Sequence, residues 1–159
     1  SALLSGSAGT VFPWWWNHLH PRGGWGTWAA LARFLEGTGV GGPGWAPVEG
    51  ATAVIVGPDG TPGAPCDVFA LANGASALAY VVDPACHYPN GATATDPAPV
   101  RARLSLPMTP APGAVRVEVW DPVKGERVSG ISLPRGPETL EVLLPFAVDC
   151  AVRALPSDE

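Results

Sequence analysis

The chain has few charged residues and no long hydrophobic run, and each of these absences excludes a class of function. Only 14% of its 159 residues are charged, its nine Lys and Arg are scattered, and the formal net charge is −5. A nucleic-acid or anionic-membrane surface needs a basic cluster or stripe, so neither partner is expected. No run approaches the roughly eighteen apolar residues of a membrane-spanning helix. Residues 1–7 also lack the charged start and apolar stretch of a signal peptide.

Cysteine is scarce as well. Cys66, Cys86 and Cys150 are an odd number and include no Cys-x-x-Cys pair, so no disulfide framework is predicted and the compartment stays undecided. Cys66 and Cys150 fall in strand-like runs and are interpreted as small core residues. Cys86 stands beside His87 in a Pro/Gly-rich stretch and could be a reactive thiol, although the inert interpretation is favoured.

The usual catalytic and cofactor motifs are missing. His18 and His20 could ligate a metal only with help from the remote Cys86-His87 pair, and a zinc site needs three or four convergent ligands. There is no Gly-x-Ser-x-Gly motif, and the glycine-rich stretch 37–44 lacks the Lys-Ser/Thr ending of a phosphate loop. We therefore expect no catalytic residue, no metal and no cofactor.

Short apolar runs between turn signals are what the chain does have. Nineteen Pro and twenty Gly separate them, without any repeating triplet. Runs of four to eight residues with no helix between them predict a mainly β protein: an antiparallel β-sandwich, Ig-like or jelly-roll-like, of seven or eight strands with one N-terminal α-helix. The expected strands are residues 52–56, 67–71, 77–82, 100–106, 115–120, 130–133, 139–144 and 148–155.

Alternation within these runs indicates one buried and one wet face. Between residues 115 and 120, three valines alternate with Arg116, Glu118 and Trp120. Glu118 and Glu141 are thus expected on wet strand faces, where they could pair but carry no mechanism. Trp120 could stack on a sugar, or it could pack against the N-terminal helix. Residues 121–125, with a Pro and a final Gly, read as a hairpin loop.

One helix is predicted before the glycine-rich stretch. Thr27 is a plausible N-cap and Gly37 a plausible stop. Trp28, Leu31 and Leu35, together with Ala32, follow helical spacing and predict a single apolar stripe. We expect residues 10–36 to be a docking element, with Trp28, Leu31 and Leu35 facing the sandwich or a second chain.

Three consecutive tryptophans, Trp14, Trp15 and Trp16, stand out near the start. Neighbours on an extended segment point to opposite faces, and each ring can bury about 150–250 Å². Both faces of this segment are therefore expected to be buried. One face would pack against the body of the protein, and the other against a ligand, a partner chain or further polypeptide. All three could equally be core anchors.

Residues 10–18, Thr-Val-Phe-Pro-Trp-Trp-Trp-Asn-His, and the helix pattern ending Ala-Leu-Ala-Arg-Phe-Leu-Glu-Gly at residue 37 carry a resemblance. They resemble the eighth strand, loop and helix of a cellulase-like (β/α)8 glycoside hydrolase. The remainder resembles the β-sandwich that often follows such barrels, in which a strand ending like Val119-Trp120-Asp121-Pro122 turns through a Gly near position 125. The resemblance divides the chain into a barrel remnant (1–37), a Gly/Pro linker (38–50) and a β-sandwich domain (51–156).

The resemblance implies a catalytically incomplete chain. Retaining glycosidases need two carboxylates about 5–5.5 Å apart, and the family carries them on strands that would lie upstream of residue 1. It also implies that Trp14, Trp15 or Trp16 could stack on a sugar at the C-terminal face of a barrel. Asn17 stands where the family often has an acidic residue, which puts a polar substrate contact there in doubt.

Three functions follow as expectations. The preferred one is a non-catalytic accessory domain that supports a sugar-cleaving barrel, with carbohydrate or that parent barrel as partner and a homodimer through the Trp-rich segment as a further possibility. The second is an independent carbohydrate-binding module, which needs exposed, coplanar aromatics such as Trp45, Tyr88 or Trp120. The third is a stand-alone glycosidase or metal-dependent hydrolase, which needs a pocket with converging carboxylates or a metal site.

Overall fold

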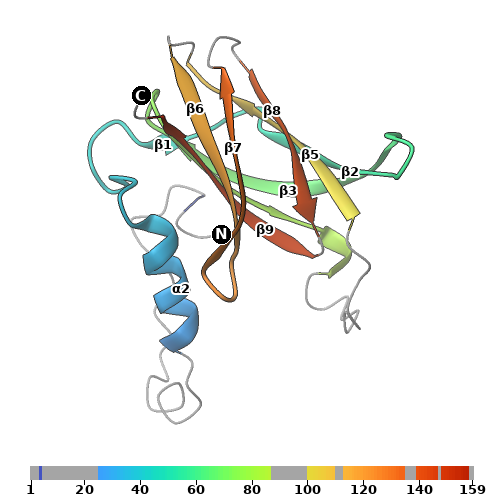
Figure 1. Cartoon of the computed structure of the whole chain (residues 1–159), viewed down its shortest axis with the longest axis horizontal. Helices are drawn as coiled ribbons and strands as arrows, with labels where there is room; N and C mark the ends of the chain where they lie inside the picture. Colours follow the sequence, from blue (N-terminus) through green and yellow to red (C-terminus); the bar gives the residue numbers. More distant parts are fainter. Residues whose placement is uncertain are drawn as a thin grey trace.

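The part of the chain that the structure describes folds into antiparallel strands with one α-helix against them, in agreement with the predicted fold class (Figure 1). The computed structural model describes residues 4, 25–86, 100–109, 113–134, 139–146 and 148–157. Its elements are α2 (Trp25–Leu35), β1 (Ala46–Pro47), β2 (Thr52–Val56), β3 (Pro62–Ala72), β4 (Ala77–Val82), the 3-10 turn η2 (Pro84–Cys86), β5 (Val100–Pro107), β6 (Ala114–Asp121), β7 (Glu126–Pro134), β8 (Thr139–Phe146) and β9 (Asp149–Pro156).

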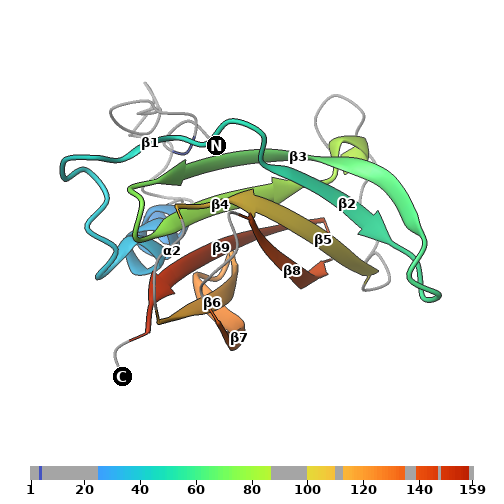
Figure 2. The ribbon, with the colours of Figure 1, turned by 90° about the horizontal axis from the view of Figure 1, so that it is seen from above.

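The strands follow one hydrogen-bonded path, β7-β6-β9-β4-β3-β2-β5-β8, and β1 pairs with β3. β3 joins two halves, because its first residues pair with β2 and its last six pair with β4. The sheet curls until it is nearly a barrel, with β7 and β8 at the two ends of the path (Figure 2). β1 lies within the predicted linker at 38–50 and brings the described strands to nine, more than the seven or eight expected.

All eight predicted strands are present, and most boundaries agree to within two residues. β3 and β7 begin earlier than predicted. The first half of β3 contains Pro62, Gly63 and Pro65, which are poor strand formers, but it pairs with β2 only and so lies at an edge, where proline is tolerated. β7 is exposed over most of its length, so its first residues show no hydrophobic alternation that could have marked them.

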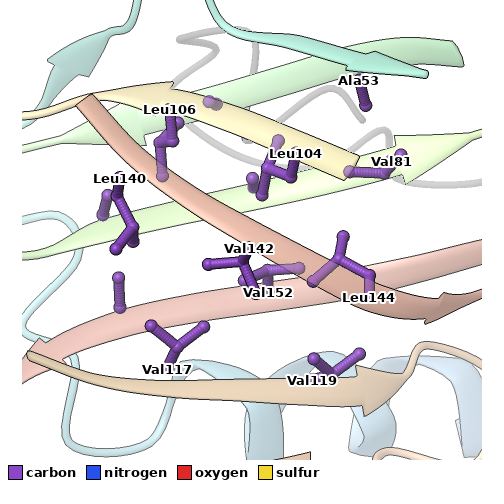
Figure 3. Packing of buried hydrophobic residues seen from close by; sticks show 14 of the residues in the cluster. Ala53, Val81, Leu104, Leu106, Val117, Val119, Leu140, Val142, Leu144 and Val152 are labelled. Atoms are coloured by element: carbon purple, nitrogen blue, oxygen red, sulfur yellow. The ribbon is translucent and has the colours of Figure 1, made fainter. Parts of the chain in front are cut away.

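The core between the two halves of the curled sheet is aliphatic. Val117 and Val119 of β6, Val152 of β9, Leu104 of β5 and Leu144 of β8 point into one shared space (Figure 3). Alanines and valines supply most of the rest, and the described members of this cluster include no aromatic side chain. We call it the inner core. Its members alternate along each strand with residues on the opposite face, as a half-buried strand requires.

The helix differs from its prediction in two ways. It begins at Trp25, so the interpretation of Thr27 as N-cap is wrong. Its most buried residues are Ala30 and Phe34, with Leu31 and Leu35 half-buried on one flank and Ala32 exposed. The buried stripe is thus rotated by about one residue from the predicted one, and Ala30 is the helix residue that the β6–β7 turn approaches at Gly125. Gly37 does end the helix, with a φ of +73° that favours glycine.

Candidate functional site: the helix-binding face

The outer face of β3, β4, β9 and β6 carries three aromatic side chains, those of Phe69, Tyr80 and Trp120. Strand register aligns Phe69, Tyr80, Ala151 and Trp120 in one row across these strands. The next row is Leu71, Leu78, Arg153 and Glu118. Helix α2 lies against this face (Figure 1). The resulting hydrophobic cluster, which we call the outer cluster, contains Leu4, Phe34, Leu71, Leu78 and Ala151, with Leu31, Leu35, Val40, Trp45, Phe69, Tyr80 and Trp120 packed against them.

A buried carboxylate occupies one edge of this face. Glu118 is 2% exposed, so the expectation that it lies on a wet face is wrong. Its Oε2 accepts from Arg153 Nε at 2.5 Å and from Trp120 Nε1 at 3.2 Å. Its Oε1 lies 3.2 Å from both Arg127 Nη1 and Arg116 Nε. A buried charge is costly unless it is paired and hydrogen-bonded, and Glu118 meets both conditions.

The arginines also decide how Glu118 titrates. Burial acts to raise the pKa of the Glu118 carboxyl, but the hydrogen bond and positive charge of Arg153 oppose it, helped by hydrogen bonds from Trp120 and Arg127. The favourable interactions prevail, and the pKa of Glu118 is held below its ordinary value. The carboxylate therefore stays ionised down to acidic pH.

Arg153 connects this carboxylate to the helix. While its Nε binds Glu118, its Nη1 donates to the carbonyl oxygens of Phe34 and Glu36, each at 3.0 Å. These carbonyls lie at the C-terminal end of α2, where backbone acceptors lack intrahelical partners and a cation is favoured. The guanidinium carbon also lies 4.3 Å from the centre of the Trp120 ring, which meets Phe34 edge-on. One arginine thus joins β9, β6 and α2.

The β6–β7 hairpin holds the middle of the helix. Arg33 donates from Nε to the Gly125 carbonyl at 3.2 Å and from Nη2 to the Lys124 carbonyl at 2.7 Å. Gly125 has a φ of +64°, and a Cβ added there would sit 2.4 Å from the Cα of Ala30. Asp121 braces the turn by accepting backbone N–H groups of Val123 and Lys124. Only glycine at position 125 lets helix and hairpin approach this closely.

The loop after the helix also returns to the sheet. Thr38 is buried and donates to the Leu35 carbonyl at 2.7 Å, which caps the helix end. Half-buried Trp45 donates from its indole nitrogen to the Gly39 carbonyl and packs against the outer cluster. β1 follows directly and pairs with β3. The stretch read as a linker is therefore tied to the sheet at its far end.

Trp120 and Trp45 are the predicted sugar-contacting candidates within the described part of the chain, and Trp45 packs against the outer cluster as described above. Trp120 is the one of the two that was also predicted to pack against the helix. It is half-buried, with Arg153 over one ring face and Phe34 against it, so it packs on the helix, which was the alternative prediction for this residue. Trp14, Trp15 and Trp16 lie outside the described residues, as do Asn17, His18, His20, His87 and Tyr88. Whether any of these tryptophans binds sugar stays a prediction.

Other candidate residues have ordinary surroundings. Glu141 is exposed on β8 opposite Ser105, on the other half of the sheet from Glu118, so the two carboxylates do not pair. Cys150 is buried and Cys66 half-buried in the inner core, as predicted, and burial raises the pKa of the Cys150 thiol to about 12. Burial, with a 2.6 Å hydrogen bond to Asp149, likewise raises the pKa of Tyr80.

Among the described residues, no group of three His, Cys, Asp or Glu side chains is arranged to hold a metal ion. In the same part of the chain, no helix has the length and hydrophobicity needed to cross a membrane.

Sequence reasoning missed Arg153, Arg33 and Phe34 as the residues that hold the helix. The sequence does contain a signal for the Glu118–Arg153 ion pair. Glu118 stands between valines on a strand, and Arg153 stands between Val152 and Ala154 on another. Opposite charges flanked by apolar residues on two strands indicate an ion pair across a sheet.

Comparison with known proteins adds no relative, because no family model, no curated protein and no solved structure matches this chain.

Proposed function

We propose that this chain is a non-catalytic accessory β-sandwich domain that supports a sugar-cleaving barrel by holding a helix of the adjoining unit against its sheet. The observation that carries the proposal is the attachment of α2. Arg153 binds its C-terminal carbonyls, Arg33 binds the hairpin, and Gly125 admits the backbone of Ala30. These contacts hold α2 in one position on the sheet, as is expected if a neighbouring domain depends on where the helix lies.

The chemistry of the buried acid supports a non-catalytic role. A retaining glycosidase needs two carboxylates, one of them a nucleophile open to substrate. Glu118 is the one buried carboxylate among the described residues, and both of its oxygens are bound to arginine. Asp149 accepts the Tyr80 hydroxyl, and Asp121 accepts the backbone of its own turn. These three carboxylates therefore make contacts that stabilise the fold, which supports a non-catalytic role.

The aromatic residues also favour support over independent sugar binding. A carbohydrate-binding surface needs aromatic rings open to solvent in one plane. Phe69, Tyr80 and Trp120 do lie in one row, but all three are half-buried in the outer cluster. Trp25 is the one aromatic residue among the exposed large hydrophobic side chains of the described part.

The purified chain can be titrated with a panel of β-linked and α-linked neutral polysaccharides, followed by tryptophan fluorescence and parallel glycosidase assays. We expect neither hydrolysis nor saturable binding of a neutral glycan. Hydrolysis would overturn the non-catalytic assignment, and saturable binding would replace it with an independent carbohydrate-binding module. Limited proteolysis supplies the positive arm: α2 should resist cleavage in the wild-type chain and become cleavable in Gly125→Ala.

A further inference from the structure

Two arginines beside Glu118 carry positive charge that the described part of the chain does not neutralise. Three guanidinium groups, of Arg116, Arg127 and Arg153, surround the one carboxylate of Glu118. Three positive charges against one negative charge leave an excess of two. This excess is notable in a chain whose formal net charge is −5.

The three arginines divide into one structural residue and two accessible ones. The Arg153 side chain is 12% exposed and is occupied by Glu118, Phe34 and Glu36. Arg116 and Arg127 are 46% and 58% exposed, and among the described residues each is paired with Glu118 alone. Arg116 uses Nε and Arg127 uses Nη1 for this contact, so the other guanidinium N–H groups are available to a ligand.

Glu118 fixes these two cations close together. Arg116 Nε and Arg127 Nη1 both lie 3.2 Å from the same oxygen, Oε1, so they lie within twice that distance of each other. Two like charges held this close repel, and a second anion on the solvent side would relieve the repulsion. A pair of planar guanidinium forks is suited to a carboxylate, which accepts two parallel hydrogen bonds.

The β7 residues opposite Glu118 and Arg116 are small. Gly130 lies opposite Glu118 on β7, so the two arginine side chains reach the carboxylate past a position with no side chain. Ser132, exposed, lies opposite Arg116 and adds a hydroxyl. β7 is an edge strand exposed over most of its length, so an extended ligand can lie along it.

We propose that Arg116 and Arg127, with Ser132, form a binding site for the carboxylates of an acidic, uronic-acid-containing polysaccharide. The proposal rests on the accessory role argued above and adds a ligand class to it. Charge complementarity selects an anion, and an exposed edge strand suits an extended chain of repeated carboxylates. Trp120 lies directly across from Arg127, so the site borders the aromatic row of the same sheet face.

The first test is calorimetric titration with sodium polygalacturonate at low salt. Fully methyl-esterified polygalacturonate, which has the same backbone without free carboxylates, is the matched ligand control. We expect saturable binding to the acid form, weakening as salt rises, and none to the ester. Equal binding of acid and ester, or no binding of either, would overturn the proposal.

Variants assign the site. Arg116→Gln and Arg127→Gln should each weaken binding by about tenfold, because each removes a charge-assisted pair. Arg101→Gln and Arg103→Gln remove the same charge from exposed positions on β5, in the other half of the sheet, and should change affinity by less than about twofold. An equal loss in the β5 variants would mean that general charge attraction, and not this site, binds the polymer.

Two further measurements test whether guanidinium geometry matters in addition to charge, and whether the ligand is a polysaccharide or a polypeptide. Arg127→Lys keeps the charge and the Glu118 pair but loses the planar fork, so it should fold normally and bind intermediately. Polyglutamate presents carboxylates on a peptide, and equal or tighter binding of polyglutamate would overturn the polysaccharide assignment. If none of these ligands binds while α2 remains protected from proteolysis, the carboxylate site is rejected and the accessory role stands. If any glycan is hydrolysed, the accessory role itself is rejected.

Discussion

The two faces of the strands β3, β4, β9 and β6 bury hydrophobic residues in different ways. On the inner face, alanine, valine and leucine meet the same residue types from β2, β5 and β8. On the outer face, aromatic residues meet one helix, and a buried Glu–Arg pair stands among them. Aliphatic packing tolerates exchange of similar side chains, whereas hydrogen bonds and a close backbone approach fix one geometry. The inner core therefore specifies the sheet, and the outer cluster specifies where the helix lies.

The comparison predicts that the largest single loss of stability comes from the inner core. Leu104→Ala removes a fully buried side chain from β5 and should lower the free energy of unfolding by about 3–5 kcal/mol. Leu143→Ala, on exposed β8 surface, is the matched control and should cost less than about 0.5 kcal/mol. Urea unfolding followed by circular dichroism measures both. Equal effects would contradict the assignment of the inner core.

A smaller loss, confined to the outer cluster, is expected from Gly125→Ala. The added methyl overlaps the backbone of Ala30 and imposes a positive φ on alanine, for a combined cost of about 2–3 kcal/mol. Gly60→Ala shares the positive φ but has nothing within 4 Å, so it isolates the backbone cost of about 1–2 kcal/mol.

Near-ultraviolet circular dichroism, which reports aromatic packing, should change in Gly125→Ala and stay unchanged in Gly60→Ala. If the two variants behave alike in both stability and aromatic signal, the close approach of helix and hairpin is not what fixes α2.

The same contrast explains what the sequence could predict. The inner core can be predicted from alternation, which is a local property of the sequence. Valines at 115, 117 and 119 alternate with polar residues, and alternate residues of a strand share one face, so these valines are predicted to face the core together. All eight predicted strands, the hairpin at 121–125 and the helix stop at Gly37 follow from such local rules. Alternation also separates the residues on the two faces, but it does not say whether the second face meets water or a helix.

The two errors that concern the outer face, the exposure of Glu118 and the direction of the helix stripe, arise because the second face meets a helix. Alternation along its strand predicts a solvent-facing Glu118, but Arg153, which binds this carboxylate, also binds the end of a helix more than eighty positions earlier in the chain. The helix stripe was centred on Leu31 and Leu35 from hydrophobicity, but the contact is centred on Ala30 because a glycine ninety-five residues away admits its backbone. Contacts between such distant residues depend on tertiary packing, which no local pattern contains.

The rotation of the helix stripe can be tested with two aspartates. Leu31→Asp places a charge in the half-buried flank of the outer cluster and should destabilise the chain by about 2 kcal/mol. Ala32→Asp, one position along the same helix, faces solvent and should cost less than about 0.5 kcal/mol. Thermal melting compares them, and mass measurement in solution tests whether the helix also joins two copies. Unchanged melting and mass in Leu31→Asp would refute the docking of α2.

A still smaller effect is expected at the buried carboxylate. Glu118→Gln keeps the shape and some hydrogen bonding but leaves Arg153 without its counter-charge, which should cost about 1–2 kcal/mol. Glu141→Gln is the exposed control and should be nearly neutral. If Glu118→Gln is as stable as the wild-type chain, the ion pair contributes specificity of helix position without net stability, and near-ultraviolet circular dichroism should then be the only signal that changes.

The smallest expected effect is a dependence on pH that belongs to Glu118. Its pKa in the folded chain is below the ordinary value, so the stability it contributes is complete above the unfolded-state pKa and is lost as pH falls through the folded pKa. Asp121 and Asp59 also have lowered pKa values, but they titrate in the wild-type chain and in Glu118→Gln alike. The stability difference between these two proteins therefore isolates Glu118. It should narrow as pH falls from about 6 to about 3, because protonation of Glu118 then removes the stability that its charge contributes. Urea midpoints measured across that range decide the matter, since a constant or widening difference would mean that the arginines do not hold this carboxylate ionised.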